Sequence, residues 1–139
     1  MNMTKHELRE QVFKAVFSID TQLETESGIV PEEIVKNYLT KSCDEPLTED
    51  ETDYIFTKAS AIGDMLTQLD DEINAVAEGW KTNRMGKAEL NILRLAVYEI
   101  RYDESIPVKV AINEAVELAK EYCNQDAPAF INGMLAHFA

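Results

Sequence analysis

The stretch LNILRLAVYEI, residues 90–100, decides the fold class of this chain. Its apolar residues recur three and four positions apart, which places them on one face of an α-helix. They are Leu93, Ala96, Val97 and Ile100. The pattern predicts a helix over residues 87–102.

The same helical period recurs on both sides of this stretch, and turn residues separate the repeats. The other predicted helical segments are residues 4–20, 31–41, 48–79 with a break expected near 67–71, 108–123 and 128–138. Thr4 and Thr48, each followed three residues later by a glutamate, are the predicted N-caps of two of them. Residues 42–47 are a predicted loop and residues 79–86 a connector. Six or seven helices without a convincing strand pair indicate an all-α fold.

Size and composition narrow the class of protein. The chain has 139 residues and a formal net charge of −13, from 26 acidic and 13 basic side chains. This length suits one domain. No apolar run reaches the roughly 20 residues of a membrane span, and the N-terminus lacks an apolar signal segment. Cys43 and Cys123 lie far apart without a CxxC pattern, which favours a reducing cytoplasm.

Charge is unevenly distributed along the chain. Residues 79–101 carry five basic side chains against two acidic ones, and residues 1–19 carry three against two. Residues 20–53, in contrast, carry eleven acids against two lysines. Two basic islands allow a local positive face on an otherwise acidic protein, which would permit contact with nucleic acid. The alternative is that the acids only keep the surface soluble.

Motifs for catalysis are missing from the sequence. It contains no GxxxxGK[ST] phosphate loop, no GxGxxG after a strand and no HExxH zinc pattern. The only histidines, His6 and His137, stand at opposite ends of the chain, and neither cysteine has a neighbouring base. These absences disfavour an enzyme and a metal site at either histidine, and an enzyme without cofactor motifs is left as a poorly supported alternative. His6 is predicted to lie at the surface and His137 on the polar edge of a helix.

The start of the first predicted helix is a better binding feature. Lys5, His6 and Arg9 occupy about one turn there, with Phe13 beyond them. Single-stranded RNA is commonly held by cations that face its phosphates beside aromatic rings that stack on its bases. Three cations alone would bind weakly and in a salt-sensitive way. The alternative, which we favour, is that Phe13 and Phe17 belong to the core.

Four segments stand out as ordered motifs. They are LREQVFKAVFSID (8–20), LNILRLAVYEI (90–100), IPVKVAINEAVELAK (106–120) and FINGMLAHF (130–138). In sequence, order and separation they resemble the NusB family of bacterial transcription antitermination factors. The resemblance implies an all-α fold of two small helical bundles sharing long helices. It also implies a single RNA-binding domain over residues 1–139, with subdomains of about 1–79 and 80–139.

The resemblance also implies a function. NusB-like proteins are non-enzymatic, cytoplasmic adaptors that need no cofactor. They bind boxA RNA in nascent ribosomal RNA transcripts together with a small-subunit ribosomal protein, NusE. The assembly then helps RNA polymerase to pass premature terminators. We therefore expect boxA RNA, NusE and the RNA polymerase antitermination complex as partners, and no membrane.

Candidate RNA-binding residues follow from the family's motifs. The family's arginine-rich N-terminal segment falls on Lys5, His6 and Arg9, where only one arginine remains. Lysine and histidine are poorer planar donors than arginine, so a weaker intrinsic grip on RNA is expected. The family's acidic residue near the last turn matches Asp126, and the aromatic residue after it matches Phe130. Asp126 either accepts hydrogen bonds from bases or caps the last helix.

Candidate partner-binding residues also follow from the resemblance. Phe17, Glu89 and Tyr98 match positions at or near the interface with the ribosomal protein. A basic partner would give the acidic excess a physical role, because complementary charge speeds encounter and orients docking. Asn113, within the third motif, is expected instead to satisfy backbone groups between helices.

Two alternatives from other classes remain open. The thinned basic segment and the charge of −13 are also compatible with a protein-only helical interaction module, or a homodimer, with weak or lost RNA binding. NusB-like domains also occur as appendages of ribosomal RNA methyltransferases. No glycine-rich cofactor domain follows residue 139 in this sequence, so that activity is not expected.

Overall fold

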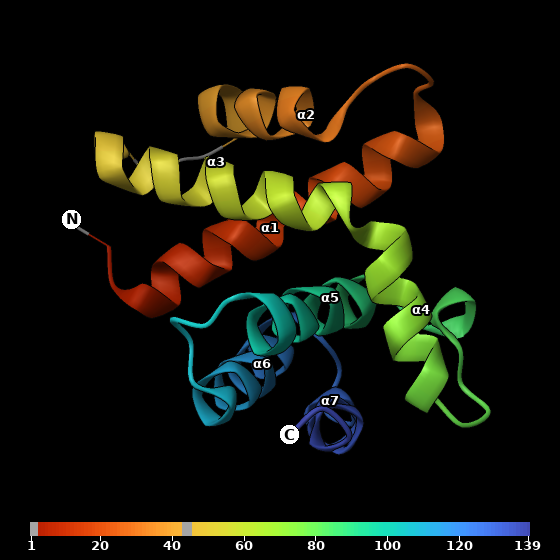
Figure 1. Cartoon of the computed structure of the whole chain (residues 1–139). Helices are drawn as coiled ribbons and strands as arrows, with labels where there is room; N and C mark the ends of the chain where they lie inside the picture. The colour runs from red at the N-terminus through yellow and green to blue at the C-terminus, as the bar shows by residue number, and fades with distance from the viewer. Residues whose placement is uncertain (1–2, 43–45) are drawn as a thin grey trace. The chain divides into compact units, whose positions relative to one another are not determined.

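Seven α-helices make up most of residues 3–42 and 46–139, the part of the chain that this computed structural model describes (Figure 1). They are α1 (Lys5–Thr25), α2 (Pro31–Asn37), α3 (Glu49–Asp64), α4 (Leu66–Val76), α5 (Lys87–Tyr102), α6 (Val108–Tyr122) and α7 (Ala127–Ala136). A π-helical turn, η1 (Tyr38–Ser42), continues α2, and a 3₁₀ turn, η2 (Thr82–Arg84), precedes α5. The described residues contain no strand, so the predicted all-α class is confirmed.

The chain divides into two compact units, one ending at Met65 and the other running over Leu66–Ala139. Helices α1 to α3 form the first unit, and α4 to α7 form the second. The division falls earlier than residue 79, where the sequence had placed the boundary between subdomains. The physical reason is that α4 packs against α5 and so belongs with the C-terminal helices.

The first unit is built around α1, which packs against α2 and α3 (Figure 1). The side chains that meet there are fully buried and aliphatic. They include Val12, Val16, Ile19, Ile34, Val35, Ile55 and Ile62. Helix α1 extends to Thr25, beyond the predicted end near residue 20, and its last turns carry the exposed residues Thr21 and Leu23–Thr25. An exposed end lacks the apolar periodicity on which the sequence prediction rested.

A break between α3 and α4 falls at Met65, slightly before the predicted region of 67–71. The Met65 amide bonds to the carbonyl of Ile62 at 3.0 Å, a tightened last turn that ends α3. Close packing accompanies this end of the helix. A Cβ atom added at Gly63 would lie 2.8 Å from Pro31 Cβ and 2.9 Å from Ile19 Cδ1. Glycine at 63 therefore lets α2 and α1 approach the end of α3.

Helix α5 is the centre of the second unit, since α4, α6 and α7 all pack against it. It spans Lys87–Tyr102, as the opening stretch predicted. The unit's fully buried aliphatic side chains are Leu69, Ile73, Ile92, Leu93, Leu118, Ile131 and Leu135, among others. None of the helices in the described parts of the chain combines the length and apolar content that crossing a bilayer requires.

A buried arginine holds α4 to α5. Arg94 is 5% exposed and donates two hydrogen bonds of 2.7 Å to the Asp70 carboxylate, one to each oxygen. It donates a third, at 2.9 Å, to Asn91 Oδ1, and the Asn91 amide in turn donates to the carbonyl of Lys87. This network uses a planar two-pronged donor against a carboxylate, the geometry that suits arginine best. Arg94 is therefore a structural cation.

Candidate nucleic-acid interface

The basic start of α1 is held by a capping box, as predicted. Thr4 Oγ1 accepts a hydrogen bond from the Glu7 amide at 3.1 Å, and the Thr4 amide donates to the Glu7 carboxylate at 2.9 Å. The Met3 amide also donates to the buried Glu51 carboxylate of α3 at 2.7 Å. These contacts fix the backbone from which Lys5 projects, and Lys5 is exposed.

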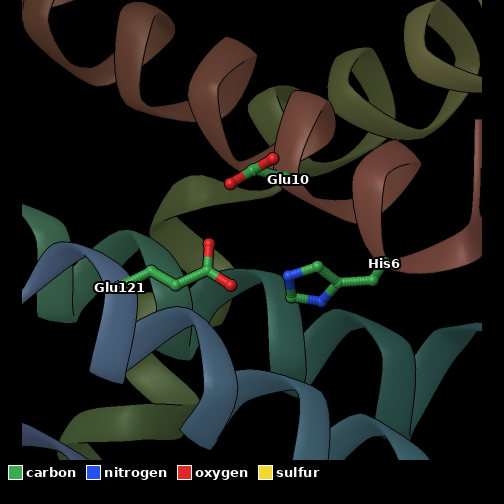
Figure 2. Close-up of side chains that lie close together, drawn as sticks. All are labelled: His6, Glu10 and Glu121. Atoms are coloured by element: carbon green, nitrogen blue, oxygen red, sulfur yellow. The ribbon is translucent and has the colours of Figure 1, made fainter.

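The other two predicted cations are less accessible. His6 is half-buried rather than a surface residue, and Arg9 is only 5% exposed. Figure 2 shows His6 beside Glu10, one turn further along the same helix, so a carboxylate shares the histidine's face of α1. Among the three predicted phosphate-facing side chains, Lys5 alone is fully presented to solvent.

Aromatic side chains of α1 divide between two environments. Phe13 is 3% exposed and belongs to the core, as favoured from the sequence. Phe17 is half-buried and meets Phe13 edge-on, with ring centroids 6.2 Å apart. Phe17 thus keeps part of its surface available to a partner, whereas Phe13 has almost none for a base.

The second unit contains a hollow that brings three predicted residues together. Glu89, Asp126 and Phe130 line it, although the sequence had placed Glu89 with the partner and the other two with RNA. Three more residues complete the lining, Trp80, Asn124 and Ala127, and the volume is about 170 Å³. We call this site the Trp80 hollow. Its walls are aromatic on Trp80 and Phe130, and its polar atoms come from two carboxylates and one amide.

Asp126 occupies the N-cap position of α7 but does not cap it. Its backbone is in the right-handed helical region, and its side chain accepts no capping hydrogen bond. The Asp126 amide instead donates to Asn124 Oδ1 at 3.1 Å. Of the two roles left open by the sequence, capping is thus not used, and the carboxylate lines the hollow.

Trp80 and Arg84 are functional candidates that sequence reasoning missed. Trp80 is 45% exposed, and the Arg84 guanidinium carbon lies 5.1 Å from the centre of its ring, a cation–π arrangement. Both residues lie in the predicted connector, whose arginine was counted in a basic island, but neither of them was singled out as a binding residue. The available signal was a lone tryptophan outside any apolar repeat, with an arginine four positions on.

An asparagine on α4 positions this connector. Asn74 Oδ1 accepts from the Thr82 amide at 2.8 Å, and Asn74 Nδ2 donates to Thr82 Oγ1 at 3.2 Å. Lys81 Nζ donates to the Asn74 carbonyl at 2.8 Å. Before these contacts the chain turns at Gly79, whose φ of 73° is a conformation that favours glycine. Buried Met85 then anchors the far end of the connector.

The remaining predicted partner residues sit on α5. Glu89 lies in its first turn and accepts a hydrogen bond from the Gly86 amide at 3.3 Å, although glycine has no side chain to return the bond. Tyr98 is half-buried and packs against Tyr102 with ring centroids 6.0 Å apart. Asn113, expected to lie between helices, is exposed on α6, and Asn91 holds that internal role instead.

A half-buried thiol lies near the hollow's acidic wall. Burial raises the pKa of Cys123, and the negative charge of Glu89 raises it further. Both effects disfavour the thiolate, so Cys123 is a poor nucleophile at neutral pH.

Comparison with known proteins identifies the family. The NusB family model matches residues 6–139. The transcription antitermination protein NusB of Agathobacter rectalis is 46% identical over 137 residues, covering 99% of this chain and 100% of that protein. The solved structure of T. maritima NusB matches with a TM-score of 0.84 and 31% identity, covering 100% of this chain and 92% of that one.

A further structure shares the fold, the complex of antitermination factors NusB and NusE with double-stranded RNA. It matches with a TM-score of 0.74 and 22% identity, and covers 98% of this chain and 97% of that one. The family suggested by the four sequence motifs is thus confirmed across nearly the whole chain. The chain belongs to the NusB family.

Proposed function

We propose that this protein is a transcription antitermination factor that binds boxA RNA of nascent ribosomal RNA transcripts together with NusE. In this role it would act in the cytoplasm within the RNA polymerase antitermination complex. The observation that carries the proposal is the match to the NusB family over residues 6–139. A NusB of the same fold assembles with NusE and RNA in its solved complex, which adds support for these partners.

The proposed role requires binding rather than catalysis. We assign the protein as a non-enzymatic adaptor whose two units serve as one RNA-binding domain. The sequence lacks the phosphate-loop, dinucleotide and zinc motifs sought above. The histidines lie in different units, His6 on α1 and His137 at the end of α7.

Two sets of side chains are assigned to the proposed interfaces. For RNA they are Lys5, His6, Arg9, Asp126 and Phe130, of which Lys5 and Asp126 are exposed, while buried Arg9 would support this surface without meeting a phosphate. For the ribosomal partner they are Phe17, Glu89 and Tyr98, all half-exposed. The net charge of −13 supports a basic partner, because attraction between opposite charges accelerates encounter.

Fluorescence anisotropy tests the proposal. Labelled boxA RNA is titrated with the protein alone, with NusE alone, and with both together at low salt. We expect the pair to bind more tightly than either component, and a scrambled RNA of equal length to show a smaller gain. The absence of any partner-dependent gain would reject the proposal.

A protein-only interaction module is the second candidate, and the burial of Arg9 favours it. It predicts that NusE association persists when Lys5 and Arg9 are both replaced by glutamate. It also predicts negligible RNA binding by the unmodified protein. The same titrations therefore separate the two candidates, and sedimentation of the protein alone reports whether it forms a homodimer.

A further inference from the structure

We propose that Glu51, a side chain of α3, positions the start of α1 for RNA and thereby raises the affinity of the pair with NusE for boxA RNA. The inference rests on the proposed RNA-binding function and adds to it a positioning residue that does not touch the RNA itself. Glu51 is fully buried, whereas Lys5, the cation that it serves, is exposed. The residues involved all belong to the first unit, on the side where α1 and α3 both begin (Figure 1).

The Glu51 carboxylate joins two segments that lie far apart in the sequence. One oxygen, Oε1, accepts a hydrogen bond from the Thr48 amide at 2.9 Å, within the capping box of α3. The other, Oε2, accepts a hydrogen bond of 2.7 Å from the amide of Met3, which lies 48 positions away. Met3 is followed directly by Thr4, the N-cap of α1, and by Lys5. The bond from Met3 therefore ties the residues ahead of α1 to α3.

Capping alone does not account for the burial of Glu51. The capping box at the start of α1 uses Glu7 in the same way, and Glu7 is exposed. Taking a carboxylate out of water is costly unless hydrogen bonds compensate for the lost hydration. Glutamine is also suitable at this position of a capping box, so capping does not demand a charge. The feature that distinguishes Glu51 is its second oxygen, which holds the Met3 amide.

Order ahead of α1 affects RNA affinity through conformational entropy. If the backbone of a residue is mobile in the free protein, it must be fixed when RNA binds, and the cost of fixing it weakens binding. The bond from Met3 and the cap at Thr4 fix this backbone before RNA arrives. Lys5 then needs only its side chain to be ordered against a phosphate. Loss of the Met3 bond should therefore weaken RNA binding even though every cation is retained.

The charge of Glu51 separates this prediction from a simple electrostatic effect. Glu51→Gln removes one negative charge from the unit that carries Lys5, and electrostatics alone would then raise the affinity for phosphates. Glutamine has one acceptor oxygen and one amino group. It can keep the bond from Thr48, but it then presents a donor to the Met3 amide. Positioning thus predicts weaker RNA binding in this variant, whereas charge predicts tighter binding.

Fluorescence anisotropy of labelled boxA RNA with NusE measures the effect on the full chain. We expect Glu51→Gln to weaken binding by the pair by about 5- to 30-fold, the factor for ordering one further residue on binding. Glu7→Gln is the matched control, because it makes the same change in a capping box that stays within α1, and it should not weaken binding. The slope of log affinity against log salt should be the same in Glu51→Gln as in the wild type, because the phosphate contacts are kept.

Met3→Pro removes the same hydrogen bond from the donor side, because proline has no N–H. It leaves the Glu51 carboxylate and its bond from Thr48 in place. We expect a loss of affinity similar to that of Glu51→Gln, and a double variant within about twofold of the weaker single variant. In NMR relaxation, the order parameters of the Thr4 and Lys5 amides should fall in all three variants. Circular dichroism checks that each variant is folded under the titration conditions.

Several outcomes would overturn the inference. One is that folded Glu51→Gln binds RNA as tightly as the wild type or more tightly. Another is that the losses of the two single variants multiply in the double variant, because they would then arise from different contacts. A lowered salt slope in Glu51→Gln would also reject it, because a cation contact would have been lost.

The same titrations separate this inference from the proposed function. If the unmodified pair fails to bind boxA RNA, the proposed function is rejected and the inference with it. If the unmodified pair binds boxA RNA and both single variants match it, the inference alone is rejected.

Discussion

The start of α1 and the connector before α5 are both basic in sequence, yet they present their charge differently. In α1, Arg9 is buried and His6 half-buried, so Lys5 is the exposed member of that group. In the connector, Arg84 is exposed and lies over an exposed tryptophan. A cation's position along the chain therefore says little about its availability. Its helix face and packing decide whether it is a structural group or a binding group.

Two arginines of the second unit test this distinction with the largest expected effect. Arg94→Met leaves Asp70 and Asn91 without their donor, and should lower the free energy of unfolding by about 3 kcal/mol. Asp70 is 24% exposed, so water offsets part of the loss. Arg84→Met, in contrast, should change stability by less than about 0.5 kcal/mol. Urea denaturation followed by circular dichroism measures both, and equal losses would contradict the distinction.

The anchors of the two basic segments give the next contrast. Asn74→Ala removes both side-chain hydrogen bonds to Thr82 and should cost about 1–2 kcal/mol. Thr4→Ala removes the cap of α1 and should cost about 1 kcal/mol. Hydrogen exchange at single amides separates the two variants better than the free energy of unfolding does. Amide hydrogen exchange at Thr82 should accelerate only in the first variant and exchange at Glu7 only in the second, and an exchange pattern common to both would show that the segments are not held independently.

Much of the fold follows from the sequence because most helices here carry their own signals. Helix α5 begins and ends where its apolar period predicts, and both threonine caps form as expected. The end of α3 is different. There Gly63 packs closely against Pro31 and Ile19, which is a contact between three helices that no local pattern records.

The candidate site is less predictable for a similar reason. Asp126 and Phe130 were identified by resemblance, and the structure places them in one hollow with Glu89. Trp80 was overlooked because its place in that lining depends on the fold of the connector. That fold in turn depends on Asn74, which lies on another element. Residues whose role arises from such distant contacts carry no local spacing signal.

The salt dependence of RNA affinity gives a smaller effect that also separates exposed from buried cations. Lys5→Gln removes one exposed cation, so the slope of log affinity against log salt for boxA RNA with NusE should fall in magnitude by about 0.7. Arg84→Met should produce a similar change. Arg9→Gln should leave the slope unchanged, since Arg9 is buried. If Arg9→Gln lowers the salt slope while the variant stays folded, the result would show that Arg9 contacts an RNA phosphate.

Thiol reactivity gives the smallest expected effect and tests the acidic wall of the hollow. In a Cys43→Ser background, alkylation of Cys123 should be slower at pH 8 than in urea, because its raised pKa leaves less thiolate in the folded state. Glu89→Gln should accelerate it modestly, since the charge of Glu89 is the lesser cause after burial. Glutamine keeps an acceptor for the Gly86 amide, so the start of α5 is preserved. An unchanged alkylation rate in that variant would show that the charge of Glu89 does not affect the Cys123 thiol.

The buried carboxylate of Glu51 couples the start of α1 to the start of α3, so we expect the two helix starts to unfold together. One of its oxygens accepts from the Thr48 amide and the other from the Met3 amide. If the residues before α1 lose their order, the fully buried Glu51 carboxylate at the start of α3 loses the hydrogen bond from the Met3 amide. If α3 unwinds instead, the Met3 amide loses its acceptor. The two helix starts should open as one cooperative event, and trimming the chain ahead of Thr4 would loosen a helix more than forty residues away.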